Sequence, residues 1–216
     1  ADGSISTAKL ADTAVSTAKI ADDAVGNTKL DLSANYAFTG TITGTPQSFV
    51  KTGSLASTTN AGEYNLDSVF SATYLNYFVT FKTAIAVDGN QCHLKFRTGG
   101  SSNSSASYQS GTRIIDQSAS FDTESNANGN SAVLGTSLEG TDSKGMQGFM
   151  YINSPFSTSY FTMVQTHFNL QTSAGTKKFC FGGIMFEGTT SFDGFQFTTN
   201  SGDLSFVDCH VYGIKE

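Results

Sequence analysis

The sequence predicts a mostly β protein, in which an N-terminal shaft of repeats precedes an antiparallel, jelly-roll-like β-sandwich. Three observations lead to this prediction. The first thirty residues repeat with a period of ten, apolar and polar residues alternate from Ser48 onward, and the composition favours strands. Only 14% of the 216 residues are charged, whereas the chain contains 18 Phe and 8 Tyr. Abundant aromatic residues suit strands better than helices.

The predicted shaft covers residues 1–35 and begins with three decads, ADGSISTAKL, ADTAVSTAKI and ADDAVGNTKL. Ten residues cannot bury an apolar face alone, so such units must stack on copies of themselves or on other chains. Ser6 and Ser16 are good helix N-caps, which favours short helix–turn units over a β-spiral or a disordered linker. The fifth and tenth positions of each decad supply the apolar residues expected on a trimer axis: Ile5, Leu10, Val15, Ile20, Val25 and Leu30. We also expect further chain upstream of Ala1.

A joint is expected at residues 36–47, where Thr-Gly pairs around Ile42 indicate an extended segment with bends before Pro46. The sandwich domain then covers residues 48–216. Apolar residues share one face of its first clear strands, namely Leu75, Tyr77, Val79 and Phe81, then Cys92, Leu94 and Phe96. The side chains expected to face water on the second strand are His93, Lys95 and Arg97.

Asp88-Gly89-Asn90 between these two runs is typical of a β-hairpin turn. Later alternating runs predict strands at 146–152, 161–170, 178–186, 194–198 and 204–214. Residues 179–186 are apolar on both faces, which indicates a central strand or a strand between subunits. About eight strands with turns at this spacing are typical of a β-sandwich, with at most a helical turn near residues 66–71.

Two polar segments, residues 99–107 and 122–131, are predicted to be long loops, because their composition cannot pack a core. Loops on a rigid scaffold often recognise a ligand. The receptor-binding candidates in and beside these segments are Tyr108, Arg113, Asn126, Asn128 and Asn130.

Composition argues against several other functions. The net charge of −6 disfavours nucleic-acid binding and adsorption to anionic membranes, and no apolar run is long enough to span a membrane. Cys92, Cys180 and Cys209 lie in apolar runs, so we expect buried thiols rather than disulfides. Neither the acids Asp116, Asp122 and Glu124 nor the isolated His93, His167 and His210 form a recognisable catalytic or metal-binding pattern. We therefore expect no enzyme activity, metal or cofactor.

The repeated STAKLAD and STAKIADDAV units, the YAFTGTITGTP joint and the β-rich body together resemble fibre proteins of tailed, especially marine, bacteriophages. The C-terminal tract is similar too, with GFQF at 194–197, SGDL at 201–204 and VYGIK at 211–215. The resemblance implies a homotrimer, a shaft rooted in the virion and a distal domain that meets the host surface. It also makes residues 203–214 the last strand, at the edge of the sandwich. No catalytic residue is carried over.

The expected function is that of a virion fibre, assembled in the host cytoplasm, whose sandwich binds a host cell-surface glycan. The alternatives are a capsid decoration fibre with a mainly structural role and, less favoured, a polysaccharide depolymerase. The expected partners are two copies of the chain itself, tail or capsid proteins reached through an upstream anchor, and host polysaccharide. Neither nucleic-acid binding nor membrane insertion is expected.

Sedimentation equilibrium tests the shaft. The full chain should sediment as a trimer, because single decads need neighbours to bury their apolar residues. A compact monomer with mobile decads would contradict the shaft and the fibre that rests on it.

Overall fold

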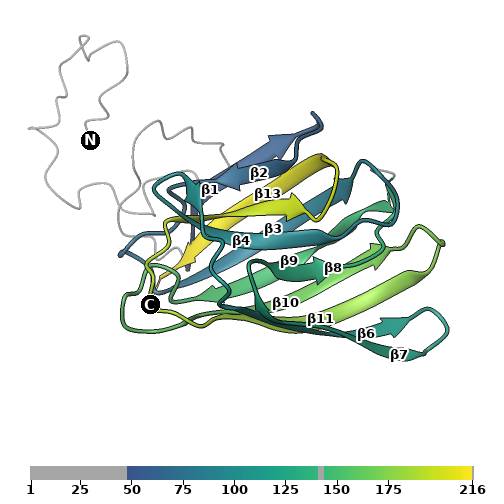
Figure 1. The fold of residues 1–216 in the computed structure, drawn as a ribbon. Helices are drawn as coiled ribbons and strands as arrows, with labels where there is room; N and C mark the ends of the chain where they lie inside the picture. Colours follow the sequence, from purple (N-terminus) through teal and green to yellow (C-terminus); the bar gives the residue numbers. More distant parts are fainter. Residues whose placement is uncertain (1–47, 141–143, 216) are drawn as a thin grey trace, which may run out of the picture. The chain divides into compact units, whose positions relative to one another are not determined.

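A computed structural model describes residues 48–140 and 144–215, which form two antiparallel β-sheets (Figure 1). The larger sheet contains, in spatial order, β1 (Phe49–Ser57), β13 (Leu204–Ile214), β3 (Asn76–Ile85), β9 (Met146–Asn153), β10 (Thr162–Gln171), β11 (Lys177–Phe186), β6 (Tyr108–Asp116) and β7 (Phe121–Gly129). The smaller sheet contains β2 (Glu63–Leu66), β12 (Gly194–Thr199), β4 (Cys92–Thr98) and β5 (Ser101–Ser102), and β8 (Ala132–Gly135) pairs with β4. The predicted mostly β, antiparallel fold is confirmed.

The shaft at 1–35 and the joint at 36–47 lie outside the described residues. The same is true of the six residues predicted for the trimer axis, Ile5, Leu10, Val15, Ile20, Val25 and Leu30. Their predictions stay predictions. No helix within residues 48–140 and 144–215 has the length and apolar character needed to cross a membrane.

The strands follow the period-two pattern of their sequences. In β10, Val164, Thr166, Phe168 and Leu170 are buried while the residues between them are exposed. In β13, Val207, Cys209 and Val211 are buried, as predicted. The five strands expected after residue 145 are all present, with bounds that differ by at most one residue at either end. Leu75 is an exception, because it precedes β3 and is exposed.

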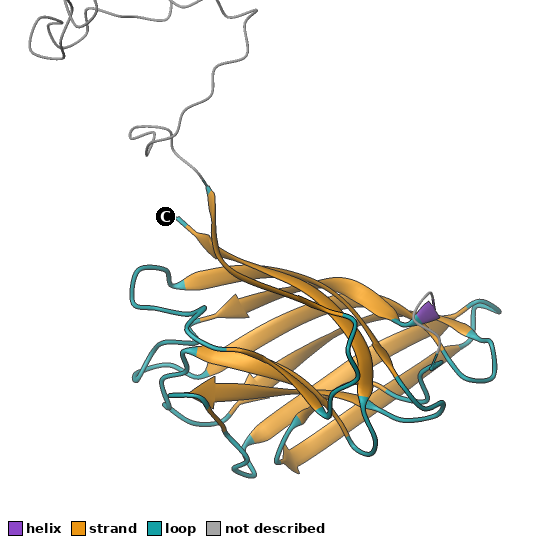
Figure 2. Ribbon diagram, turned by 90° about the horizontal axis from the view of Figure 1, so that it is seen from above, coloured by secondary structure: helices purple, strands orange, loops and turns teal. Residues whose placement is uncertain are grey.

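The core lies between the inner faces of the two sheets (Figure 2). Phe96 of β4 stacks on Phe192, with ring centroids 4.8 Å apart, and on Tyr108 of β6 at 6.0 Å. Phe81 of β3 meets Phe197 of β12 at 5.5 Å. Since burying one Phe side chain stabilises a fold by about 1.5–3 kcal/mol, these contacts between sheets hold the sandwich together.

Two predictions about strand neighbours and one about a loop are wrong. The turn at Asp88-Gly89 exists, but it joins β3 of the larger sheet to β4 of the smaller one, so it is not a hairpin. β13 lies between β1 and β3 rather than at an edge. Residues 122–131, predicted to be a loop, belong mostly to β7, the polar edge strand of the larger sheet. An edge strand needs backbone partners on one side only, so a polar sequence suffices there.

Arg97 was predicted to face water, yet its exposed fraction is only 5%. Its Nε donates to Asp67 Oδ1 at 2.6 Å and its Nη1 donates to Gln196 Oε1 at 2.7 Å. Its Nη2 also donates to the carbonyl of Gly100 in the turn after β4. The segment at 66–71, where a helical turn was expected, instead supplies Asp67 to this ion pair. Charge pairing and hydrogen bonds therefore offset the cost of burying the guanidinium.

Cys92, Cys180 and Cys209 are free and buried, as predicted. Burial raises the pKa of the Cys92 thiol to about 12 and, with a smaller contribution from Glu124, that of the Cys180 thiol to about 12. Burial also raises the pKa of Cys209. Because the thiolate is the reactive form, these thiols are inert near neutral pH.

Thiol labelling checks this burial. An aromatic disulfide reagent at neutral pH should leave all three cysteines unmodified in the native protein and should modify all three in guanidinium chloride, since unfolding restores ordinary thiol pKa values. Fast labelling of the native protein would contradict the buried positions of these side chains.

Candidate functional site

The inner face of the larger sheet packs on the smaller sheet, whereas its outer face carries exposed apolar side chains. Strand register arranges the outer-face residues in rows that run across the strands. The row that contains two glycines, called here the glycine row, consists of Phe78, Tyr151, Gln165, Gly183, Gly111 and Ser125. The next row consists of Thr80, Phe149, His167, Phe181, Arg113 and Thr123.

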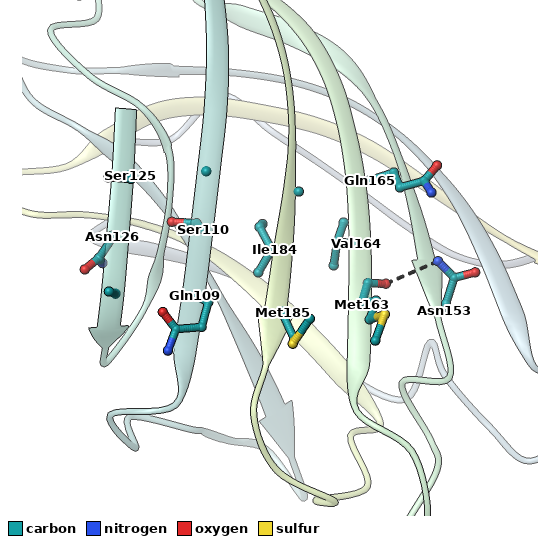
Figure 3. Close-up of a pocket in the computed structure, with 13 residues that line it drawn as sticks. Gln109, Ser110, Ser125, Asn126, Asn153, Met163, Val164, Gln165, Ile184 and Met185 are labelled. Atoms are coloured by element: carbon teal, nitrogen blue, oxygen red, sulfur yellow. Dashed lines mark hydrogen bonds between the residues drawn. The ribbon is translucent and has the colours of Figure 1, made fainter. Parts of the chain in front are cut away.

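A groove of about 510 Å³ lies over the glycine row, across β10, β11, β6 and β7 (Figure 3). Met163 and Met185, from the row on the other side of the glycines, contribute to its lining. The remaining lining residues are Gln109, Ser110, Gly111, Ser125, Asn126, Ala127, Asn153, Val164, Gln165, Gly183 and Ile184. We take this groove as the candidate functional site.

Gly111 and Gly183 keep the groove open, although the backbone does not require glycine at either position. A Cβ at Gly111 would meet no atom within 4 Å, and one at Gly183 would meet only Val164 O, at 3.4 Å. By contrast, a Cβ at Gly148 or Gly182 would lie 2.1 or 2.3 Å from a neighbouring backbone oxygen. A glycine inside a strand costs about 0.5–1 kcal/mol relative to alanine. Two adjacent glycines with free space above them therefore leave room for another group to approach the sheet there.

Four amide residues from four strands line the groove: Gln109, Asn126, Asn153 and Gln165 (Figure 3). The Asn126 side chain lies on the face of the sheet that carries its buried partner Ser110, whereas the other three side chains lie on the outer face. Three of the four are oriented by hydrogen bonds. Asn126 Nδ2 donates to Ser131 O at 3.1 Å, Asn153 Nδ2 donates to Met163 O at 3.4 Å, and Gln109 Nε2 donates to Asn128 Oδ1 at 3.0 Å.

No lining residue of the groove carries a charged side chain. Two charged residues lie just outside the lining and have opposite signs. Arg113 belongs to the neighbouring row, and Glu187 accepts a hydrogen bond from Gln109. The lining is therefore uncharged and mostly apolar, with a few amide and hydroxyl groups, which suits a ligand without net charge.

Beside the groove, rings form a continuous band across the sheet, called here the aromatic band: Phe49, Phe78, Phe149, Tyr151, His167 and Phe181. Phe149 and His167 stack with centroids 5.2 Å apart and planes 3° apart, and Phe181 follows His167 at 6.2 Å. Because these three rings stack on one another along the row, they turn their edges rather than their faces toward solvent. The aromatic band is thus an apolar surface in which the stacked rings Phe149, His167 and Phe181 present edges to solvent.

The five receptor-binding candidates do not all lie at the groove. Tyr108 is fully buried, donates its hydroxyl to Asn103 O and accepts a hydrogen bond from Phe96 N, so its prediction as a contact residue is wrong. Asn126 lines the groove, and Arg113 lies in the neighbouring row. Asn128 bonds to Gln109 at the end of β7, and Asn130 is exposed in the turn to β8.

Apart from Asn126, the lining residues were not among the predicted site residues; they include Gly111, Gly183, Gln165, Asn153 and Met163. The available signal was a Gly-Gly pair at 182–183 within an otherwise strand-like run. A glycine within a strand often indicates close approach of another group.

The acidic residues have structural roles. Asp116 accepts hydrogen bonds from Ser118 and Ser120, and the bond from the Ser118 side chain lowers the pKa of its carboxyl most. Glu124 lies 3.6 Å from Lys178 Nζ and accepts a hydrogen bond from Thr136. Asp122 accepts a hydrogen bond from the backbone of Thr123.

The three histidines have different surroundings. His93 lies between Ser131 and Gln91, and burial lowers its pKa. His210 lies 3.3 Å from Asp208, and His167 belongs to the aromatic band. Among residues 48–140 and 144–215, no three His, Cys, Asp or Glu side chains are grouped to hold a metal ion.

Comparisons of the chain with family profiles, with curated proteins and with solved structures give no match. The function must therefore be inferred from the chemistry of the site and from the sequence motifs. The groove offers hydrogen-bonding amides, hydroxyls and apolar thioethers, which together can bind a polar neutral molecule.

Proposed function

We propose that this chain is a trimeric virion fibre protein whose β-sandwich binds a neutral glycan on the host cell surface. The observation that carries the proposal is the groove over Gly111 and Gly183, which is lined by amide groups and by no charged side chain. The proposal also includes two structural features. The decads form a shaft of helix–turn units, and the strands of the sandwich are connected in a jelly-roll-like order.

The lining of the groove suits sugars in two ways. Amide groups both donate and accept hydrogen bonds, as sugar hydroxyls require. Met163 and Met185 add polarisable apolar surface for the C–H faces of a sugar ring. An open groove on a rigid sheet binds a single short glycan weakly, and three linked copies raise the avidity without any new contact.

A second candidate function is a capsid decoration fibre with a mainly structural role. The aromatic band favours it, since an exposed apolar surface of this extent often marks a contact between proteins. Electron microscopy of virions distinguishes the two functions, because it locates the fibre on tail or capsid.

The variant Gly111→Val tests the groove. Its Cβ enters free space, and valine favours strands, so the variant should melt at or above the wild-type temperature. Its side chain should fill the groove and weaken glycan binding about tenfold or more. A glycan array followed by isothermal titration calorimetry measures this loss.

The matched control is Thr123→Val, which places the same valine side chain on the adjacent strand outside the groove lining by replacing a hydroxyl with a methyl group. It should bind glycan as the wild type does. Wild-type protein that binds no neutral glycan, or a folded Gly111→Val variant that binds normally, would refute the proposed site.

A further inference from the structure

The groove does not end at β10. A second hollow of about 470 Å³ is lined by Asn153, Ser154, Ser159, Tyr160, Phe161 and Met163. Asn153 and Met163 line both hollows, so the two are contiguous. Figure 3 shows these two residues at the end of the groove, joined by the hydrogen bond from Asn153 Nδ2 to Met163 O.

The second hollow lies against the loop that joins β9 to β10, residues 154–161. The Tyr160 side chain has an exposed fraction of 67%, and Phe161 is also exposed. Within the described part of the chain, neither ring packs against another aromatic ring. Unlike the stacked rings of the aromatic band, the ring of Tyr160 is therefore free to present its face to a ligand.

Hydrogen bonds hold the backbone of this loop in place. Phe192 N donates to Pro155 O at 2.8 Å, and Ser191 Oγ donates to Phe156 O at 3.0 Å. Within the loop, Tyr160 N donates to Ser157 Oγ at 3.1 Å. A loop whose first half is bonded to the neighbouring segment, and whose backbone at Tyr160 is bonded to Ser157, loses less conformational freedom on binding, which makes it a suitable support for an exposed ring.

The length and the charge of the combined site define its ligand. The groove spans β10 to β7, which at the ordinary strand spacing is about 14 Å, and the second hollow extends it beyond β10. This is longer than a single sugar ring. Neither hollow is lined by a charged side chain, so the complementary ligand carries no charge along this length.

We infer that the groove and the loop of Tyr160 form one continuous site for a linear, uncharged oligosaccharide of several sugar residues. One segment of the oligosaccharide lies over Gly111 and Gly183, and a later segment stacks on Tyr160. This inference rests on the proposed glycan binding and adds the length of the ligand and a second subsite to it.

A length series tests the inference. The probes run from monosaccharide to hexasaccharide and are cut from the neutral polysaccharide that binds the full chain best on the glycan array. Calorimetry should show that affinity rises with length for the wild type. The variant Tyr160→Ala should lose about fivefold to tenfold in affinity for the long probes, which is the usual contribution of an aromatic contact, and nothing for the shortest one. Tyr160→Phe should bind as the wild type does, because it keeps the ring.

Phe121→Ala is the matched control, since Phe121 has the same exposed fraction of 67% and lines neither hollow. Affinity that is independent of length, or a Tyr160→Ala variant that behaves like this control, overturns the second subsite. In that case, loss of binding in Gly111→Val still supports the groove and the proposed function. If no neutral polysaccharide binds the wild type, the proposed function and the inference both fail.

Discussion

The outer face of this molecule depends on an uninterrupted hydrogen-bonded register across β3, β9, β10, β11 and β6. No bulge interrupts the pairs β3–β9, β9–β10, β10–β11 and β11–β6. A slip of one residue in any of these pairs would turn its outward side chains toward the core, which the buried partners forbid. For example, Ile184 and Val164 are buried opposite each other in β11 and β10, and this fixes Gly183 and Gln165 on the outside. The packing of the core thus sets the order of residues in the groove.

The same register explains how much could be predicted from the sequence. Alternation located β10 and β13 well, because each has one buried and one less buried face. It could not show that the Asp88-Gly89 turn crosses between sheets, because alternation identifies a strand but not its neighbour. The buried Arg97 was missed because its ion pair with Asp67 and its hydrogen bond to Gln196 come from segments distant in sequence. The strand β7 was missed because its side chains are polar, although its backbone pairs with the preceding strand β6.

The candidate site was harder to predict than the fold. Asn126 was identified because it lies in a polar segment, but the groove also needs Gly111, Gly183 and Met163 from other strands. Their juxtaposition follows from pairing between β6, β11 and β10, which no local pattern encodes. The prediction that Tyr108 contacts a ligand was wrong for the opposite reason. It follows a polar segment in the sequence, yet its ring fills the core and its hydroxyl joins β4 to the loop before β6.

The buried thiols of Cys92, Cys180 and Cys209 have one more consequence. Since they neither form disulfides nor reach solvent, the sandwich has the same covalent structure in reducing and in oxidising surroundings. A protein assembled inside a cell and used outside it would need no oxidative maturation step, and its stability would not depend on disulfide formation.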